Sequence, residues 1–313
     1  MLTVTGLEGT YRLTPQDAPK GKFGGILRGE RIHDGLAVSA KKLPQATVPD
    51  QQSARQKVGH LDHHGITPTI ETVEYQGDSY LIRPYIEGTC FKTILKKHAI
   101  RKHLEPLFFV KAAVSLLKTL EHVHSKGLVH RDIKPSNLIL KHTPQQHPCT
   151  WNPSNIVLID FEQACVYPAA EPSRAPFALV YSPPEQLLNH NELVCPASDL
   201  FALSVTLFEL LSGSAPWVDC NAEVLMHLQL TYPMRHRPGI DEPLFEILAK
   251  AAYKEPFKLP PRRLADEVIV EILGQGIAKR YQSALDMRIE LENYLNANPE
   301  IPKHNLWGKW FGK

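Results

Sequence analysis

The chain has 313 residues, of which 43% are hydrophobic, so it can bury a substantial core and is nearer in length to two folding units than to one. Its 35 lysines and arginines nearly balance 33 aspartates and glutamates, and the formal charge of +2 gives no electrostatic reason to expect a nucleic-acid partner. No basic segment followed by an apolar core opens the sequence, and no run approaches the roughly 18 apolar residues that cross a bilayer. Five scattered cysteines without a C-x-x-C pair indicate reduced thiols, so we expect a soluble, cytoplasmic protein.

The N-terminal part of the chain has the pattern of a small sheet. From residue 11 to about residue 87, short runs of β-like composition alternate with Gly and Pro. Three of these runs are 24–27, 36–40 and 80–82. We therefore expect a sheet-rich unit in this part of the chain.

After Gly88 the pattern becomes helical. Pro106 opens a segment whose apolar residues recur at helical spacing, and Gly127 closes it. Residues 199–212 are apolar on almost every face, which is typical of a helix buried at the centre of a domain, and Gly213 is placed to cap it. These features predict a second, helical unit.

Two polar motifs flank a polar, proline-containing stretch, 141–154, that has the composition of an inserted loop. The first motif is HRDIKPSNLIL at 130–140, and the second is IVLIDFE at 156–162. The first resembles the catalytic loop H-R-D-x-x-x-x-N of protein kinases, and the second resembles the strand and D-F-G turn of the same family. The alternative, turn-forming polar residues between two short strands, is disfavoured by four matched positions within eight residues.

The resemblance implies a role for each motif residue. Phosphoryl transfer needs a carboxylate at the attacking hydroxyl and hard oxygen ligands for the Mg²⁺ on the phosphates of ATP. Asp132 would orient the hydroxyl proton, Asn137 and Asp160 would hold Mg²⁺, and Lys134 would lie against the γ-phosphate. Because serine/threonine kinases typically carry Lys two residues after the catalytic Asp, the resemblance favours serine or threonine hydroxyls of a protein substrate.

The resemblance covers residues from about 11 to 295 and implies an α+β, two-lobed fold. Residues 1–87 would form the small nucleotide-binding lobe, and 88–297 would form the helical lobe with the catalytic loop and activation segment. Residues 298–313 would form a basic, aromatic tail. The ending RYQSALDM at 280–287 looks most like bacterial serine/threonine kinases.

A glycine-containing segment at 19–26 resembles the kinase loop that covers the phosphates of ATP. Glycine is needed there because the backbone must approach the phosphates closely. Pro19 replaces the first glycine of the motif and has no N–H to donate. The positions carried over as ATP-binding are Gly21, Phe23, Gly24 and Ile26.

Further ATP contacts are implied by two later segments. Residues 38–41 (VSAK) resemble V-A-I-K, so Lys41 would pair with the α- and β-phosphates, although both Lys41 and Lys42 could instead be solvated at a strand end. In the hinge-like segment LIRPYIEG, the Pro84 carbonyl and the Ile86 N–H would meet adenine. Arg83 falls at the gatekeeper position, where a buried guanidinium needs an acid partner, unless it points outward or the register slips by one.

Several positions depart from the family pattern. No Glu occurs between Lys41 and His63, and the helix position that should pair with the lysine is Ala54. Glu162 replaces the Gly of D-F-G, and Ala178 lies where the family usually has a Thr.

The change at position 162 has two interpretations. The turn there would be strained if it required φ > 0, which is awkward for Glu. The Glu162 carboxylate either approaches Lys41 or the metal, compensating for Ala54, or points to solvent.

Other positions resemble scaffold and regulatory residues of the family. Asp199 would tie the buried helix to the catalytic loop, and Glu185 would pair with Arg280, although such a pair contributes little if exposed. Arg131 is placed to receive a phosphate from the activation segment, and the candidates for its partner are Ser173, as the phosphate acceptor, and the carboxylate of Glu171. Because five prolines restrict the segment, we expect low to moderate dependence on that phosphate.

Two weaker signals lie outside these motifs. The run HLDHH at 60–64 could hold a metal, but we expect it to form a helix-to-strand connection. The aromatic and basic end at 303–313 could dock on a membrane surface or a protein, or fold back on the body of the chain.

Three functions fit these observations. The first is an active serine/threonine protein kinase, and the second is a catalytically impaired kinase fold that acts as a binding or regulatory module. The third, a small-molecule phosphotransferase, is disfavoured by the A-P-E-like segment at 181–185 and the RYQSA region.

Overall fold

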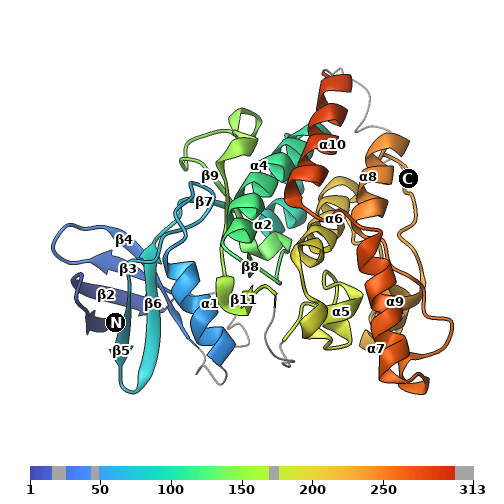
Figure 1. The fold of residues 1–313 in the computed structure, drawn as a ribbon. Coiled ribbons are helices and arrows are strands. Elements are labelled where there is room, and N and C mark those ends of the chain that lie inside the picture. The colour runs from blue at the N-terminus through green and yellow to red at the C-terminus, as the bar shows by residue number, and fades with distance from the viewer. Residues whose placement is uncertain (16–25, 44–48, 169–175, 300–313) are drawn as a thin grey trace.

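The structure is a computed structural model that describes residues 1–15, 26–43, 49–168 and 176–299. Figure 1 shows a sheet-rich N-terminal part beside a larger helical part. This is the expected α+β, two-lobed architecture. Among the described residues, no helix is long and apolar enough to cross a membrane.

The N-terminal part is built on a six-stranded antiparallel sheet in the order β1-β2-β3-β4-β6-β5. Its strands are β1 (Leu2–Thr5), β2 (Thr10–Pro15), β3 (Ile26–Arg31), β4 (Ala37–Lys42), β5 (Glu71–Tyr75) and β6 (Asp78–Pro84). β1 was not predicted, and β3 begins at Ile26 and continues beyond the predicted run.

The register of this sheet decides which side chains face the active site. Val38, Ala40 and Ile82 are buried in the core on one face. Because neighbouring side chains along a strand point to opposite faces, Lys41 and Arg83 lie on the other face. β4 and β6 pair so that Lys41 lies opposite Leu81 in the ladder.

Helix α1 (Pro49–Gly59) lies between the sheet and the helical part (Figure 1). It packs against β11 (Cys165–Val166) and the short 3₁₀ turn Phe161–Gln163. Ala54 is 2% exposed and belongs to the large core of the helical part. The helix therefore lies beside the turn that carries Glu162.

The helical part is organised around α6, which is buried along almost its whole length. Its helices are α2 (Phe91–Lys96), α3 (His98–Arg101), α4 (Pro106–Ser125), α5 (Pro184–Leu187), α6 (Pro196–Ser212), α7 (Ala222–Thr231), α8 (Glu242–Ala251), α9 (Asp266–Ala278) and α10 (Ala284–Ala297). The predicted start of a helix at Pro106 is confirmed, and Gly213 caps α6 in the left-handed region at φ 88°.

Two small sheets hold the polar motifs beside these helices. One has the order β10-β9-β7, and β11 pairs with β8 in the other. Their remaining strands are β7 (Gly88–Cys90), β8 (Leu128–Val129), β9 (Leu138–Lys141) and β10 (Ile156–Leu158). The stretch 141–154 connects β9 to β10, and the catalytic-loop motif connects β8 to β9.

Candidate active site

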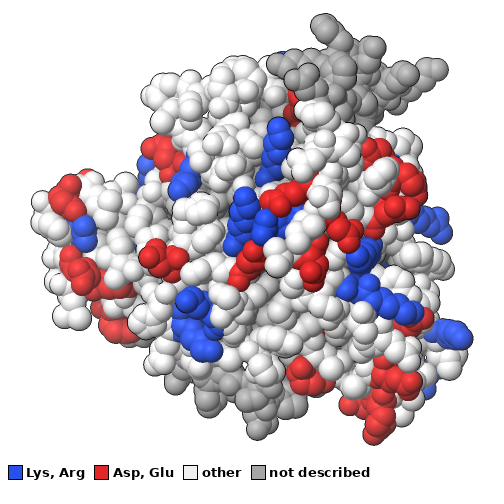
Figure 2. Space-filling model, turned by 45° about the horizontal axis from the view of Figure 1, so that its top comes forward, with Lys and Arg blue, Asp and Glu red and all other residues white. Residues whose placement is uncertain are grey.

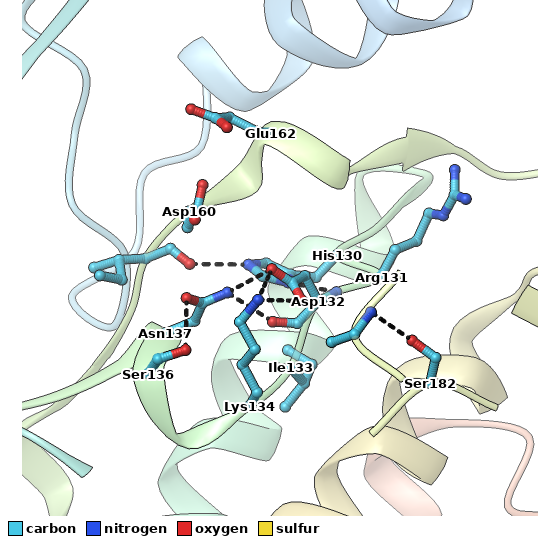
Figure 3. A network of polar contacts seen from close by, with 12 residues as sticks. His130, Arg131, Asp132, Ile133, Lys134, Ser136, Asn137, Asp160, Glu162 and Ser182 are labelled. Carbon is cyan, nitrogen blue, oxygen red and sulfur yellow. Dashed lines mark hydrogen bonds and ion pairs between the residues drawn. The ribbon is translucent and has the colours of Figure 1, made fainter. Parts of the chain in front are cut away.

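Three polar side chains converge in the loop between β8 and β9 (Figure 3). The Lys134 ammonium donates to both carboxylate oxygens of Asp132, at 2.7 and 2.6 Å. The Asn137 amide donates to the Asp132 backbone carbonyl and to its Oδ2, both at 2.9 Å. The structure thus brings together the three residues predicted to be catalytic and fixes the direction of the Asp132 carboxylate.

Asp199, in the first turn of α6, anchors the catalytic loop through hydrogen bonds to its backbone. Its carboxylate accepts hydrogen bonds from the backbone N–H groups of His130 (2.9 Å) and Arg131 (2.8 Å) and is in contact with His124 Nε2 at 2.9 Å. Burial acts to raise the pKa of Asp199, but the contact with His124 and the nearby His130 bring it below its usual value. The predicted tie between the buried helix and the loop is therefore present, and His124 is a partner that the motif did not indicate.

Asp160 follows strand β10, beside the catalytic loop. The Ile159 N–H donates to the Asn137 carbonyl at 3.0 Å, and the Ile159 carbonyl lies 3.1 Å from His130 Nε2. Asp160 itself is in the left-handed region at φ 68°, which Asp tolerates better than most residues. Glu162 does not have a positive φ, so the strain that such an angle would cause there is absent, and the left-handed residue lies two positions earlier, at Asp160.

Lys41 connects strand β4 of the large sheet to the turn that carries Asp160 and Glu162. Its ammonium lies 2.7 Å from Asp160 Oδ1 and 3.0 Å from Glu162 Oε1. Burial acts to lower the pKa of Lys41, but the two carboxylates raise it above its usual value. Burial likewise acts to raise the pKa of Asp160, and the Lys41 ammonium lowers it. Lys41 and Asp160 are therefore both ionised at neutral pH.

Glu162 lies close to Lys41 rather than in solvent. Its side chain is only 8% exposed, and Figure 3 shows it on the side of Asp160 away from the catalytic loop. Of the two interpretations of this departure, the structure shows the first. The carboxylate that Ala54 cannot supply from α1 comes instead from the turn after β10.

The second lysine of the strand has a different environment. Lys42 pairs with Asp78 at 2.6 Å, and both side chains are substantially exposed. The alternation of the strand thus directs Lys41 toward the polar motifs and Lys42 away from them.

Arg83 lies on the same face as Lys41, opposite Ser39 in the ladder. Its Nε atom is buried, and none of the described residues accepts a hydrogen bond from it. Burial lowers the pKa of Arg83, while the charges of Asp160 and Glu162 act to raise it. Among the alternatives for this residue, the structure shows an inward guanidinium that faces two acids without a direct ion pair to either.

Three other predicted ATP-binding residues lie in or just after strands of the large sheet. Ile26 opens β3, and Pro84 ends β6 opposite Val38. Ile86 follows β6 and is half-buried. Gly21, Phe23 and Gly24, together with Pro19, lie outside the described residues.

The donor set fits Mg²⁺. The Asp160 carboxylate and the Asn137 side-chain oxygen are hard oxygen ligands, and the Ile159–Asn137 hydrogen bond holds their backbones together. Among the described residues there is no group of three or more His, Cys, Asp or Glu side chains that could hold a metal, so the HLDHH run gains no support as a metal site. Within that run, the His63 ring instead accepts a hydrogen bond from the Gly65 N–H at 3.1 Å.

The segment after the predicted activation loop is held by buried polar contacts. Arg131 donates to the Asn191 side chain at 2.6 Å, and Gln186 donates to the Arg131 carbonyl at 3.1 Å. Glu185 accepts from Arg280 at 2.7 and 3.1 Å, and both side chains are almost fully buried. This is not the exposed, weak pair that remained possible from sequence, and the Asn191 and Gln186 contacts had no sequence signal.

The comparisons with known proteins agree with this geometry. The family model described as "Protein kinase domain" matches residues 19–261. The chain is 28% identical over 262 residues to "Serine/threonine-protein kinase PknD" of Chlamydia pneumoniae, covering 77% of this chain and 26% of that protein. It is 27% identical over 250 residues to "Serine/threonine-protein kinase PrkC" of Bacillus subtilis, covering 78% of this chain and 33% of that protein. These matches span about a quarter to a third of the length of the two relatives.

Proposed function

The chain belongs to the protein kinase domain family, and from this premise we propose that it transfers the γ-phosphoryl group of ATP to serine or threonine hydroxyls of protein substrates. The observation that carries the proposal is the cluster of Asp132, Lys134 and Asn137, next to which Asp160 is fixed by backbone hydrogen bonds. The names of the relatives support the choice of serine and threonine over tyrosine.

Each side chain has a role that follows from its position. The Asn137 amide orients the Asp132 carboxylate, which would accept the proton of the substrate hydroxyl. Lys134 holds this carboxylate in place through hydrogen bonds to both of its oxygens and would meet the transferring phosphate. Asn137 and Asp160 would hold Mg²⁺, which neutralises charge on the phosphates when bound.

Lys41 would hold the α- and β-phosphates of ATP. We propose that Glu162 takes the place of the missing helix acid, because its carboxylate lies 3.0 Å from the Lys41 ammonium and is almost fully buried. Asp160 would exchange its contact with Lys41 for Mg²⁺ when nucleotide binds, whereas Glu162 would keep the lysine in place.

We further propose that residues 1–87 form the nucleotide-binding lobe and 88–297 the lobe with the catalytic loop, since the large sheet ends at Pro84. No disulfide joins the cysteines, all five of which lie within the described residues, and this supports a cytoplasmic location. Docking through 303–313 remains part of the proposal, although those residues lie outside the described part of the chain.

The decisive experiment is incubation with labelled ATP and Mg²⁺, comparing the wild type with Asp132→Asn. We expect autophosphorylation and transfer to a generic protein acceptor by the wild type and a large loss in the variant. If the wild type binds nucleotide but transfers no phosphate, the proposed kinase activity is contradicted. That result would favour the alternative, a catalytically impaired kinase fold that acts as a binding or regulatory module.

A further inference from the structure

A cavity of about 400 Å³ lies beside the catalytic loop. Its lining includes Lys92 and Lys96 of α2 and Lys134 of the catalytic loop. Tyr181 and Glu209 also belong to its lining. Because Lys134 contacts Asp132, a side chain in this cavity would lie close to the residue that we propose as the base.

Two lysines give the cavity a positive edge. Lys92 and Lys96 are exposed and four residues apart, so they lie on the same face of α2. Within the described part of the chain, no carboxylate lies within 4.0 Å of either ammonium.

The surrounding sequence is basic as well. Residues 88–104 contain five Lys and Arg residues and no Asp or Glu, in a chain whose formal charge is only +2. By contrast, Figure 2 shows positive and negative side chains interspersed on the face that it displays. The positive run at 88–104 is therefore a local feature rather than a property of the whole chain.

The single acid in the described lining is already engaged. The Tyr181 hydroxyl donates to Glu209 Oε2 at 2.8 Å. Burial raises the pKa of Glu209, and the Tyr181 hydrogen bond together with the charges of Arg101 and Lys92 only partly opposes that rise. Glu209 is thus less available to a basic ligand than its presence in the cavity suggests.

We propose that this cavity is a subsite for an anionic side chain of the protein substrate, either an acidic residue or a phosphorylated one. The proposal rests on the proposed kinase function and adds a substrate class to it. Lys92 and Lys96 would recognise the anion while the acceptor hydroxyl reaches Asp132. Exposed ion pairs contribute little singly, so we expect the two lysines together to change selectivity by roughly 5- to 20-fold.

The test uses the full chain and peptides with one Ser or Thr acceptor, in which each flanking position carries Glu, Gln, Arg or phosphoserine. The wild type should have a higher kcat/KM for a Glu or phosphoserine peptide than for the Gln peptide at one or more positions. The Lys92→Glu/Lys96→Glu variant should lose this preference and favour Arg, with little change for the Gln peptide. The phosphoserine arm shows whether carboxylate or phosphate is the better ligand.

The matched control is Lys97→Glu/Lys102→Glu, which makes the same change of charge in the same basic run outside the cavity lining. The proposal is overturned if the wild type prefers Arg peptides, if Lys92→Glu/Lys96→Glu keeps the Glu preference, or if the control loses it equally. Failure of the wild type to phosphorylate any acceptor contradicts the proposed function instead. In that case, peptide binding measured by fluorescence anisotropy tests the subsite without turnover. The proposal then requires that the wild type bind the Glu peptide more tightly than the Lys92→Glu/Lys96→Glu variant does, and equal binding overturns it.

Discussion

The Lys41 ammonium lies 3.0 Å from the Glu162 carboxylate, and Ala54 occupies the position on α1 from which the family would supply that acid. A lysine that is partly removed from water needs a carboxylate to remain charged and positioned. In this chain the acid comes from the turn that also carries Asp160. The departures at positions 54 and 162 can therefore be understood as one exchange of partners.

This exchange predicts the effect of removing the Glu162 charge. Because Asp160 also contacts Lys41, we expect Glu162→Gln to lower kcat/KM for ATP by roughly 10- to 100-fold rather than abolish transfer. Ala54→Glu should recover part of the loss, with circular dichroism to verify that a Glu at this buried position still folds. Unchanged ATP affinity and turnover in Glu162→Gln would contradict the exchange.

Asp132 should affect the chemical step more than binding. We expect Asp132→Ala to lower phosphoryl transfer by roughly 100- to 10,000-fold, the usual scale for a positioned general base, while ATP affinity changes only a few-fold. Single-turnover kinetics and nucleotide titration measure the two effects separately. Activity equal to that of the wild type would refute the assigned mechanism.

Arg83 should influence ATP binding through charge. The charges of Asp160 and Glu162 act on Arg83, so Arg83→Met removes a positive charge near the proposed phosphate site. We expect KM for ATP to rise roughly 3- to 10-fold, with a smaller change in kcat. Lys42→Met, which removes an outward lysine paired with Asp78, is the control. If both variants have the wild-type KM, Arg83 has no electrostatic role in nucleotide binding.

Arg131 is already held by protein groups, which bears on regulation. Its guanidinium donates to Asn191 at 2.6 Å, and its side chain is buried. Ser173 and Glu171 both lie outside the described residues. We expect Ser173→Ala to change the kinase activity, measured after incubation with ATP and Mg²⁺, by less than about 3-fold. Loss of activity in Ser173→Ala with recovery in Ser173→Glu would show that a phosphate is required.

The sequence predicted those parts of the site that depend on residues close together in the chain. The spacing of Asp132, Lys134 and Asn137 places them in one short loop, and strand alternation separates Lys41 from Lys42. It could not decide whether Glu162 meets Lys41, because that contact joins residues 121 positions apart through the packing of two lobes.

The same limit applies to other features of the fold. The partners of Arg131 come from Gln186 and Asn191, which no motif connects to it. The polar, threonine-containing strand β1 carries only one buried residue, Val4, so its pattern is too weak to indicate a strand.

The last prediction concerns Lys254, a buried lysine in the helical part. Its ammonium lies 3.7 Å from the centre of the Trp217 ring, and none of the described residues accepts a hydrogen bond from it. Burial, assisted by the positive charge of Arg280, lowers the pKa of Lys254 to about 6.

The sign of the pH effect follows from this direction. Between the folded-state pKa of about 6 and the usual value of 10.5, the unfolded chain binds more protons at Lys254 than the folded chain does. The contribution of Lys254 to the free energy of unfolding therefore rises with pH between about 6 and 10.5. Below a pH of about 6, Lys254 is charged in both states, and the folded chain is destabilised by the full cost of burying that charge.

We expect Lys254→Met to raise the free energy of unfolding by roughly 1–3 kcal/mol at pH 7, because an apolar side chain of similar length removes that cost. The gain should shrink as the pH is raised toward 9, since the wild type recovers stability there. Urea unfolding of both proteins at pH 6, 7, 8 and 9 measures the difference, and Lys250→Met, which removes an exposed lysine paired with Glu290, is the control. A difference between wild type and Lys254→Met that is constant with pH would show that Lys254 stays charged in the folded chain.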